Sequence, residues 1–406
     1  MRDEGRATTL TSTAGSAAEV FVAFLKLGLT SFGGPIAHLG YFREELVLRR
    51  RWIDDAGYAD LVALCQFLPG PASSQAGFAL GLMRAGPLGA LAAWTAFTLP
   101  SAILLVLCAY GATAFGGPLG AGVLQGLKIV AVAIVAQAVW GMARSLAPDR
   151  QRAAIALGAV AMVTMLAGSL GQIAAIVAGG LAGLWLCRAG EGVRGGRLTF
   201  GISKRTGAIL LGLALVLLVT LPLARAAFPD GALALADAFY RAGALVFGGG
   251  HVVLPLLEAE VVNAGLVDVD AFLAGYGAVQ AVPGPLFTFA AYLGAVAGAE
   301  PNGPVGAAIA LVAIFLPGLL LVAGAMPFWD ELRARPAAQA AMRGTNAAVV
   351  GILGAALYDP LWTGAILGPV DFALALSGFV MLTAWRIPPW VVVLVIACAG
   401  AVRAGL

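Results

Sequence analysis

Residues 24–34 read FLKLGLTSFGG and residues 239–249 read FYRAGALVFGG, so phenylalanine, a cation, glycine and a final Phe-Gly-Gly recur at the same offsets. Residues 66–71, QFLPGP, are matched in the same way by residues 280–285, QAVPGP. Further Gly-Pro and Leu-Pro pairs follow in the same order in both halves of the chain. This ordered agreement predicts an internal duplication with roughly 165 residues in each copy.

The composition places both copies in a membrane. Of the 406 residues, 61% are apolar and only 11% are charged, and the mean hydropathy is +0.94, whereas soluble domains carry about 25% charged residues. Apolar runs such as 87–112, 119–143 and 207–224 are long enough to cross a ~30 Å hydrocarbon core as helices. The runs lack the alternation of a β-barrel. We therefore predict an all-α polytopic membrane protein.

The charge distribution indicates that the second copy is inverted relative to the first. One extra apolar helix, at about 207–224, follows a basic linker that the positive-inside rule places in the cytoplasm. An odd connecting helix turns the second copy over if each copy crosses the membrane an even number of times. In agreement, residues 43–51 are rich in arginine, while the charged residues of their counterpart, 258–270, are all acidic. The predicted parts are a cytoplasmic tail (1–17), a first repeat (18–188), a linker with the connecting helix (189–228) and a second repeat (229–406).

The apolar pieces beside the glycine and proline breaks are too short to span a membrane. The pieces 18–32, 36–48, 56–68 and 72–84 would each be ~20 Å long as helices. We interpret them as the arms of two re-entrant hairpins, and each repeat then adds about four transmembrane helices. Continuous but broken helices over 56–84 and 270–299 are the alternative.

The breaks at the tips of these hairpins are the predicted binding site. Proline removes amide donors and disfavours helix before it, so the next arm starts with free N–H groups and the positive end of its dipole. Four such ends converge if the inverted repeats pack about a pseudo-two-fold axis, which suits an anion. In the alternative, glycine and proline only kink tightly packed helices. The predicted anion-binding residues are Ser31, Gly33, Gly34, Pro35, Pro69, Gly70, Pro71, Ser73, Ser74, Gln75, Gly248, Gly249, Gly250, Pro283, Gly284, Pro285 and Thr288.

Four cations lie within apolar segments, where each costs ~2.5 to 3.5 kcal/mol unless it is paired or hydrated. Lys26 and Arg241 occupy equivalent places in the two repeats, and Lys128 and Arg343 lie on equivalent later spans. We predict that they also bind the anion. The alternative is that their side chains reach the headgroups.

Four further groups could carry protons. His38 and His251 follow the first tip of each repeat, and Glu45 and Glu260 lie farther along the same arms. Histidine titrates near neutral pH. We predict a role in proton coupling for all four, with hydrogen-bonded structural histidines as the alternative.

Motifs of catalysis or cofactor binding are missing from the sequence. It contains no HExxH, GxxxxGK[ST] or GxSxG pattern and no metal-ligand spacing. We expect neither an enzyme nor a metal, cofactor or nucleic-acid partner, and we expect transport to draw on an ion gradient or the membrane potential.

The stretch from Phe24 to Gly81, with its Gly-Gly-Pro and Gln-x-x-Pro-Gly-Pro combination, resembles the signature region of the chromate ion transporter family in its long, two-domain form. The resemblance covers about residues 20–400. It implies chromate export driven by the proton-motive force, chromate resistance, residence in the lipid bilayer of the bacterial inner (cytoplasmic) membrane, and sulfate as a competing anion. The second repeat departs from the pattern where it reads Gly-Gly-Gly-His and Leu286-Phe287.

Other functions stay open at this point. Sulfate or oxyanion uptake or exchange is the rival within the transporter class, because sulfate and chromate are both tetrahedral dianions. An anion channel is a second class, disfavoured because cations near broken helices suggest a binding site more than a multi-ion pore. A homodimer is left open as an assembly.

Overall fold

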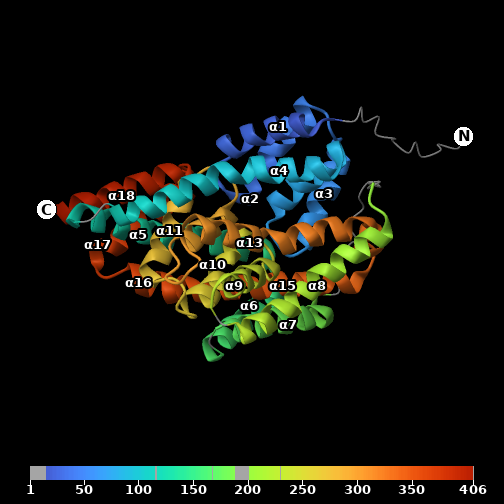
Figure 1. Cartoon of the computed structure of the whole chain (residues 1–406). Helices are drawn as coiled ribbons and strands as arrows, with labels where there is room; N and C mark the ends of the chain where they lie inside the picture. The colour runs from blue at the N-terminus through green and yellow to red at the C-terminus, as the bar shows by residue number, and fades with distance from the viewer. Residues whose placement is uncertain (1–14, 115–116, 167, 188–200, 229, 406) are drawn as a thin grey trace, which may run out of the picture.

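The computed structural model describes residues 15–114, 117–166, 168–187, 201–228 and 230–405. Most of the predicted tail and linker residues 188–200 lie outside these described residues. The described chain consists of helices and turns and contains no strand. Figure 1 shows the beginning of α1 and the end of α18 at opposite ends of an elongated molecule.

The predicted arms and spans are all present as helices, with ends within a few residues of those predicted. The first repeat contains α1 (Ala17–Thr30), α2 (Gly34–Phe42), a π-helical turn (Arg43–Arg49), α3 (Asp55–Phe67), α4 (Ala72–Ala114), α5 (Gly117–Leu146), α6 (Arg150–Met165) and α7 (Ser169–Leu186). The connecting helix is α8 (Lys204–Ala227). The hairpin region of the second repeat contains α9 (Ala232–Ala244), a 3₁₀ turn (Gly250–Val252), α10 (Val253–Leu257), a π-helical turn (Glu258–Val262), α11 (Val269–Val279), a 3₁₀ turn (Leu286–Thr288) and α12 (Phe289–Ala295). It continues with α13 (Gly303–Ala325), a 3₁₀ turn (Met326–Phe328), α14 (Trp329–Arg333), α15 (Pro336–Ala356), a π-helical turn (Leu357–Trp362), α16 (Thr363–Ala365), α17 (Pro369–Thr383) and α18 (Pro389–Gly405).

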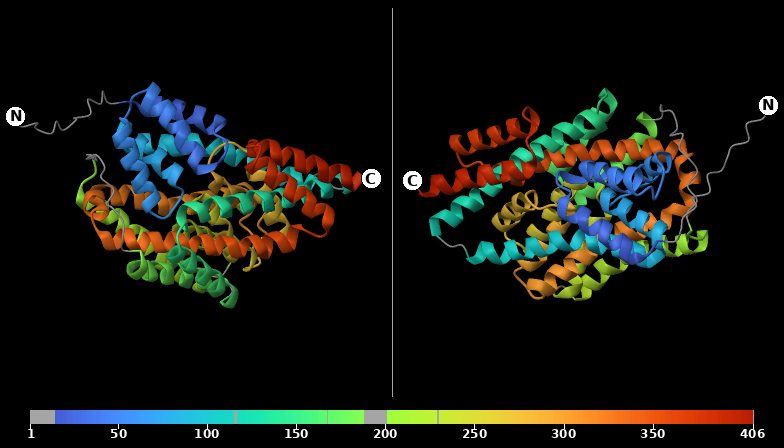
Figure 2. Two further views of the ribbon diagram at one scale, coloured as in Figure 1. Left: turned by 180° about the vertical axis from the view of Figure 1, so that it is seen from behind. Right: turned by 90° about the horizontal axis from the view of Figure 1, so that it is seen from above.

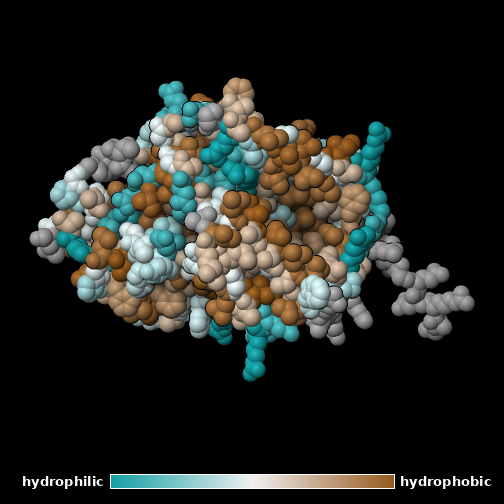
Figure 3. Space-filling model, turned by 90° about the horizontal axis from the view of Figure 1, so that it is seen from below, coloured by the Kyte–Doolittle hydropathy of each residue, from teal (hydrophilic) through white to brown (hydrophobic). Residues whose placement is uncertain are grey.

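The lengths and apolar character of these helices confirm a polytopic membrane protein. Six stretches are long and apolar enough to cross a bilayer: Ala72–Gly111, Gly117–Leu146, Ser169–Leu186, Lys204–Ala227, Gly303–Arg333 and Pro336–Ala365. Only 11% of the apolar window in α8 is buried inside the protein, as expected for a helix facing lipid. Apolar residues cover a broad area of the face shown in Figure 3.

Aspartates at equivalent positions start the same hairpin arm in both repeats. The Asp54 carboxylate accepts a hydrogen bond from the Gly57 N–H at 2.8 Å, which caps α3. The Asp268 carboxylate accepts one from the Asp270 N–H at 2.8 Å, which caps α11. These bonds satisfy orphan donors of the first helical turn. Asp54 and Asp268 are thus equivalent helix N-caps.

Both hairpins of the first repeat begin and end at the same end of the molecule. Glu19 lies at the start of the first hairpin, Trp52 lies between the hairpins, and Arg84 ends the second. The Trp52 indole N–H donates to Glu19 at 3.2 Å, and the Arg84 guanidinium pairs with Glu19 at 3.1 Å. The chain therefore returns to this end after each tip, and a continuous helix through 56–84 is not observed.

The element α4 contains two helices, the second hairpin arm and the following span. Ala85 and Gly86 have non-helical backbone angles, and the helix reverses there. Gly81 packs directly on the Gly89 carbonyl after the reversal. Because neither residue has a side chain, the arm and the span can pack backbone to backbone.

The hairpins of the second repeat enter from the other end. The Gly298 N–H, after the second hairpin, donates to the Leu266 carbonyl, between the hairpins, at 2.9 Å. Nearby, a Cβ added at Gly303, the first residue of α13, would lie 3.0 Å from the Tyr110 hydroxyl, near the end of α4. Because α4 rises ~1.5 Å per residue from the kink at residue 86 to Tyr110, this end lies ~35 Å from the one at which the first repeat turns.

The last helices of each repeat pack on the other repeat. α18 lies along α5, and α7 lies along α15, as Figure 2 shows for α15 beside α6 and α7. Glycines allow the close approach: a Cβ at Gly126 would lie 2.6 Å from the Ile396 carbonyl oxygen, and one at Gly183 would lie 2.8 Å from the Gly344 Cα. Exchange of these helices locks the two repeats into one body.

The opposite entry of the hairpins generates a prediction about sidedness. Ala56 and Ala264 are exposed alanines beside the hairpins of the first and second repeat. Single cysteines at these positions, in a background lacking the four native cysteines, should react with a membrane-impermeant maleimide from opposite sides. We expect Ala56→Cys to label in everted vesicles and Ala264→Cys in right-side-out vesicles. Labelling of both from one side would contradict the inverted arrangement.

Candidate functional site

The hairpin tips of the two repeats are joined by two equivalent backbone hydrogen bonds. The Gly70 N–H donates to the Val246 carbonyl at 2.7 Å, and the Gly284 N–H donates to the Ser31 carbonyl at 2.8 Å. In the repeat alignment Gly70 matches Gly284 and Val246 matches Ser31. The second tip of each repeat is thus held by the first tip of the other.

The first tips also touch each other. A Cβ at Gly250 would lie 2.9 Å from Cγ of Pro35, and one at Gly34 would lie 3.9 Å from Nε2 of His251. Cδ2 of Leu286, the residue that follows the fourth break, would lie 3.7 Å from the Cβ added at Gly250. All four breaks therefore lie together, as the sequence predicts.

Glycine is required at the centre of both Pro-Gly-Pro tips. Gly70 and Gly284 have φ of +120° and +101°, angles that side chains disfavour. A Cβ at Gly70 would lie 3.0 Å from Cα of Gly318 on α13, and one at Gly284 would meet the Ser101 hydroxyl on α4. Each tip is therefore wedged against the long span of the other repeat.

The carbonyl groups freed at these tips receive side-chain donors. The Gln75 amide donates to the Pro69 carbonyl at 2.9 Å and to the Gly318 carbonyl at 3.0 Å. The Ser101 hydroxyl donates to the Pro283 carbonyl, which is the equivalent of Pro69. The Pro69 and Pro283 carbonyls are thereby satisfied within the protein, as membrane depth favours.

The predicted hydroxyl ligands are buried, and two of them have no partner. Ser31 and Ser74 are 0% and 2% exposed, and their hydroxyl oxygens make no hydrogen bond in the described structure. The Thr288 hydroxyl instead donates to the Pro285 carbonyl at 2.7 Å. The Ser73 hydroxyl lies 3.4 Å from Nδ1 of His38.

The helix starts at the tips differ between the repeats. In the first repeat α2 and α4 begin directly after the breaks, at Gly34 and Ala72. In the second repeat the equivalent segments begin with 3₁₀ turns, at Gly250 and Leu286. The first repeat therefore presents α-helical N-termini at the tips and the second repeat presents tighter turns.

The structure pairs predicted anion ligands with predicted proton carriers. Lys26 contacts Glu45 at 2.8 Å in the first repeat, and Arg241 contacts Glu260 at 2.6 Å in the second. Both glutamates lie in the π-helical turns and are 6% and 5% exposed. The positive charges are therefore compensated by carboxylates of their own repeat.

Further charges complete each cluster and distinguish the two repeats. Glu45 also contacts Arg49 at 3.0 Å and Arg50 at 2.9 Å. In the second repeat, Asp237 accepts from Arg241 at 2.8 Å and from Arg225 at 3.4 Å. The first cluster thus has cations in excess, whereas the second has two cations and, with Glu260, two carboxylates.

Sequence reasoning missed Asp237 and Arg225. Asp237 is completely buried and stands four residues before Arg241, a spacing that places both side chains on one helical face. The i, i+4 spacing could have predicted the ion pair between Asp237 and Arg241.

The two cations on the later spans also have protein partners. Lys128 contacts Asp270 at 2.6 Å. Arg343 donates to the Cys187 carbonyl, with Nε at 3.0 Å. Neither makes a hydrogen bond with a tip residue in the described part of the chain.

Both predicted histidines lie beside the tips with one partner each. His38 is fully buried, its Nδ1 faces Ser73, and its Nε2 has no partner among the described residues. Nδ1 of His251 lies 2.8 Å from the Tyr276 hydroxyl.

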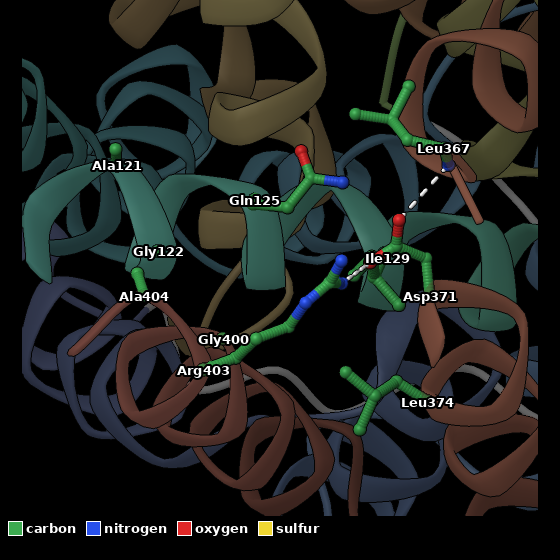
Figure 4. A pocket seen from close by; sticks show the side chains of 10 residues that line it. All are labelled: Ala121, Gly122, Gln125, Ile129, Leu367, Asp371, Leu374, Gly400, Arg403 and Ala404. Atoms are coloured by element: carbon green, nitrogen blue, oxygen red, sulfur yellow. Dashed lines mark hydrogen bonds and ion pairs between the residues drawn. The ribbon is translucent and has the colours of Figure 1, made fainter. Parts of the chain in front are cut away.

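A cavity of about 260 Å³ lies elsewhere, between α5, α17 and α18 (Figure 4). Its wall carries an ion pair between Asp371 and Arg403. Asp371 also accepts a hydrogen bond from the Leu367 N–H at 3.1 Å. The cavity contains none of the predicted site residues, and its one cation is neutralised by Asp371.

Broken helices that meet in hydrogen-bonded tips, on a helical membrane scaffold, are the architecture of secondary transporters. The family model described as "Chromate transporter" matches residues 18–184 and again residues 233–401. The chain therefore belongs to the chromate transporter family.

Curated relatives agree with this assignment. The chain is 30% identical to a chromate transport protein of Pseudomonas aeruginosa, over 93% of this chain and 90% of the relative. It is 27% identical to a probable chromate transport protein of Synechococcus elongatus, over 93% of both chains. It is 29% identical to a chromate transport protein of Cupriavidus metallidurans, over 84% of this chain and 81% of the relative. No solved structure matches the chain.

The two ion-pair clusters generate a stability prediction. Arg241→Gln leaves two buried carboxylates with Arg225 alone, and removing one partner of a buried pair costs about 3 to 5 kcal/mol. We expect a clearly lower melting temperature for the detergent-solubilised variant. The control is Lys204→Gln, which breaks a pair with Glu331 whose side chains are 65% and 57% exposed and should change stability little. Equal losses in the two variants would contradict a buried network.

Proposed function

We propose that this chain is a secondary transporter that exports chromate across the bacterial cytoplasmic membrane and thereby confers chromate resistance. Family membership and relatives named as chromate transport proteins over 81–93% of their length support chromate as the substrate. The single observation that carries the site is the pair of equivalent hydrogen bonds that joins the four breaks. Irregular backbone at membrane depth is tolerated where it lines a substrate pathway or is buried in protein.

The tips offer hydrogen-bond donors suited to a tetrahedral dianion. Hydroxyl groups such as those of Ser31 and Ser74 have no partner among the residues that the structure describes, and the first amides of α4 have none within the helix. Oxyanion oxygens accept several such bonds at once, and charge-assisted bonds are about twice as strong as neutral ones. Sulfate has the same shape and charge, so it should compete.

The ion pairs bear on the direction of transport. Protonation of Glu45 or Glu260 would release Lys26 or Arg241 and add positive charge near the tips. The protonated protein would therefore bind an anion more tightly than the deprotonated protein. Coupling by electrostatics alone would then carry a proton and the anion across the membrane in the same direction. We therefore assign the four titratable groups, these glutamates with His38 and His251, to pH control of anion affinity.

The driving force for export is then the membrane potential. A potential that is negative inside favours movement of an anion outward, at ~2.3 kcal/mol per elementary charge and 100 mV. For a dianion this amounts to about 4.6 kcal/mol. Alternation between two states follows from opposite entry of the hairpins, because one pair can open while the other stays closed.

Everted vesicles test this function. Respiration makes the vesicle interior positive, so we expect accumulation of chromate that valinomycin with potassium abolishes and nigericin leaves largely intact. The matched control is vesicles without the protein. Accumulation that depends only on the pH gradient would contradict a potential-driven exporter.

Other outcomes separate the rival functions. Linear, unsaturable chromate flux without competition by sulfate indicates a channel. Transport only from the periplasmic side, with the proton gradient, indicates oxyanion uptake. Conversion of Cr(VI) to Cr(III) indicates an enzyme.

A further inference from the structure

The repeat alignment places polar residues of the first repeat opposite apolar residues of the second. Ser31 corresponds to Val246, and Ser73 to Phe287. The same comparison pairs Gln75 with Phe289, Thr98 with Phe315, and His38 with Val253. Since all ten side chains are at most 2% exposed, these exchanges alter the interior of the protein and not its surface.

The polar residues of the first repeat lie around Phe97. The His38 ring packs edge-on against the Phe97 ring with centroids 5.4 Å apart, and Thr98 is the next residue on α4. A Cβ at Gly284 would lie 3.3 Å from the Phe97 carbonyl oxygen. The Gly284 N–H donates to the backbone carbonyl of Ser31. The group is thus assembled from α1, α2 and α4 beside one tip contact.

Five side-chain atoms beside this tip have no partner in the described structure: the hydroxyl oxygens of Ser31, Ser74 and Thr98, Nε2 of His38, and Oε1 of Gln75, which is an acceptor. Buried polar atoms are nearly always hydrogen-bonded. If the Ser73 hydroxyl donates to Nδ1 of His38, Nε2 carries the proton and is a donor as well. The first repeat therefore holds three hydroxyl groups without a partner among the described residues, beside the His38 imidazole, which also approaches the Ser31 backbone.

The second repeat carries aromatic rings at equivalent positions, and they pack on one another. Phe287 packs on Phe315 with centroids 5.7 Å apart, and Phe315 packs on Trp94 at 5.8 Å. Phe289 packs on Tyr276 at 5.7 Å. The Thr288 hydroxyl, which matches Ser74, is already used by the Pro285 carbonyl.

Four buried polar atoms lack a partner among the described residues of the second repeat, and they do not make an equivalent set. Asp237 Oδ1 and Arg241 Nε belong to the ion-pair cluster, and the other two are the Gln280 amide nitrogen, a donor, and the Asn346 amide oxygen, an acceptor. The acceptor lies 3.4 Å from the Cβ position of Gly248 and would repel an anion. Outside the ion-pair cluster, the described residues of the second repeat thus offer one unpartnered donor.

We propose that the oxyanion site is one-sided: Ser31, Ser74, Thr98 and His38 of the first repeat bind the anion, and the second repeat provides an aromatic wall. This inference rests on the proposed function, and it adds Thr98 as a ligand and removes Thr288. A tetrahedral dianion would accept bonds from the four donors on one side. The aromatic side excludes water from the other.

Matched threonine substitutions test the one-sided site. Thr98→Val keeps the shape of the side chain but removes a donor to a charged ligand, so the half-saturating chromate concentration should rise about tenfold. Because the hydroxyl is unpartnered without ligand, the melting temperature of the empty variant should stay the same or rise. A purely structural role for Thr98 would instead lower the melting temperature.

Thr288→Val should behave in the opposite way. It removes the bond to Pro285, so the empty protein should melt at a lower temperature while the half-saturating concentration stays within about twofold. Thr345→Val on α15, a buried threonine whose hydroxyl lies beside Gly180 of α7, is the control and should leave chromate affinity unchanged. Sodium chromate and sodium sulfate are the probes, in transport by vesicles and in ligand-induced shifts of the melting temperature.

The outcomes separate this inference from the proposed function. If the wild-type protein neither transports chromate nor is stabilised by it, the proposed function fails and the one-sided site fails with it. If the wild-type protein responds but Thr98→Val and Thr288→Val lose affinity equally, the site is symmetric and only the one-sided assignment is overturned. If Thr98→Val alone loses affinity, the assignment stands.

Discussion

Two backbone hydrogen bonds, from Gly70 to Val246 and from Gly284 to Ser31, are the interaction on which the rest of the structure depends. Breaking a helix inside a membrane exposes N–H and C=O groups, and each unsatisfied group costs several kcal/mol. The Gln75 amide satisfies the Pro69 carbonyl within the first repeat, but the Gly70 and Gly284 N–H groups have no partner among the described residues of their own repeat. The other repeat satisfies them. The exchange of α7 and α18 between the repeats then follows as the packing that keeps the tips in register.

The same arrangement separates charge from the tips. Lys26 and Arg241 could have been the main attraction for an anion, but Glu45 and Glu260 neutralise them within their own repeats. What the tips present is a set of neutral donors, held by a rigid backbone. Selectivity then rests on the number and geometry of hydrogen bonds, and long-range attraction comes from the excess cations around Glu45 and from the membrane potential.

Much of the fold could be predicted because apolar length and glycine or proline breaks are local signals. The short arms 56–68 and 72–84 correspond to α3 and the first part of α4, and the Pro-Gly-Pro motif between them is a tip. The site was only partly predictable. Lys26 and Glu45 are 19 residues apart along separate arms, and nothing local indicates that they pair.

Contacts between the two repeats, which are far apart in the sequence, decide which tip residues have partners. The equivalence of Ser31 and Val246 is visible in the alignment, but their bonds to Gly284 and Gly70 depend on how the two repeats pack. The unpartnered state of the Thr98 hydroxyl depends on packing in the same way. Thr98 lies in an ordinary apolar span, so its residue type alone gave no reason to select it.

The central claim is that the tips of the two repeats meet, and a disulfide between them tests it most directly. Pro35→Cys and Gly250→Cys would be combined in a chain that lacks the native cysteines and carries a protease site within residues 189–200. After mild oxidation and cleavage, we predict that the two halves migrate together on a non-reducing gel and separate on reduction. Halves that separate without reduction, as in the Pro35→Cys single variant, would contradict the account.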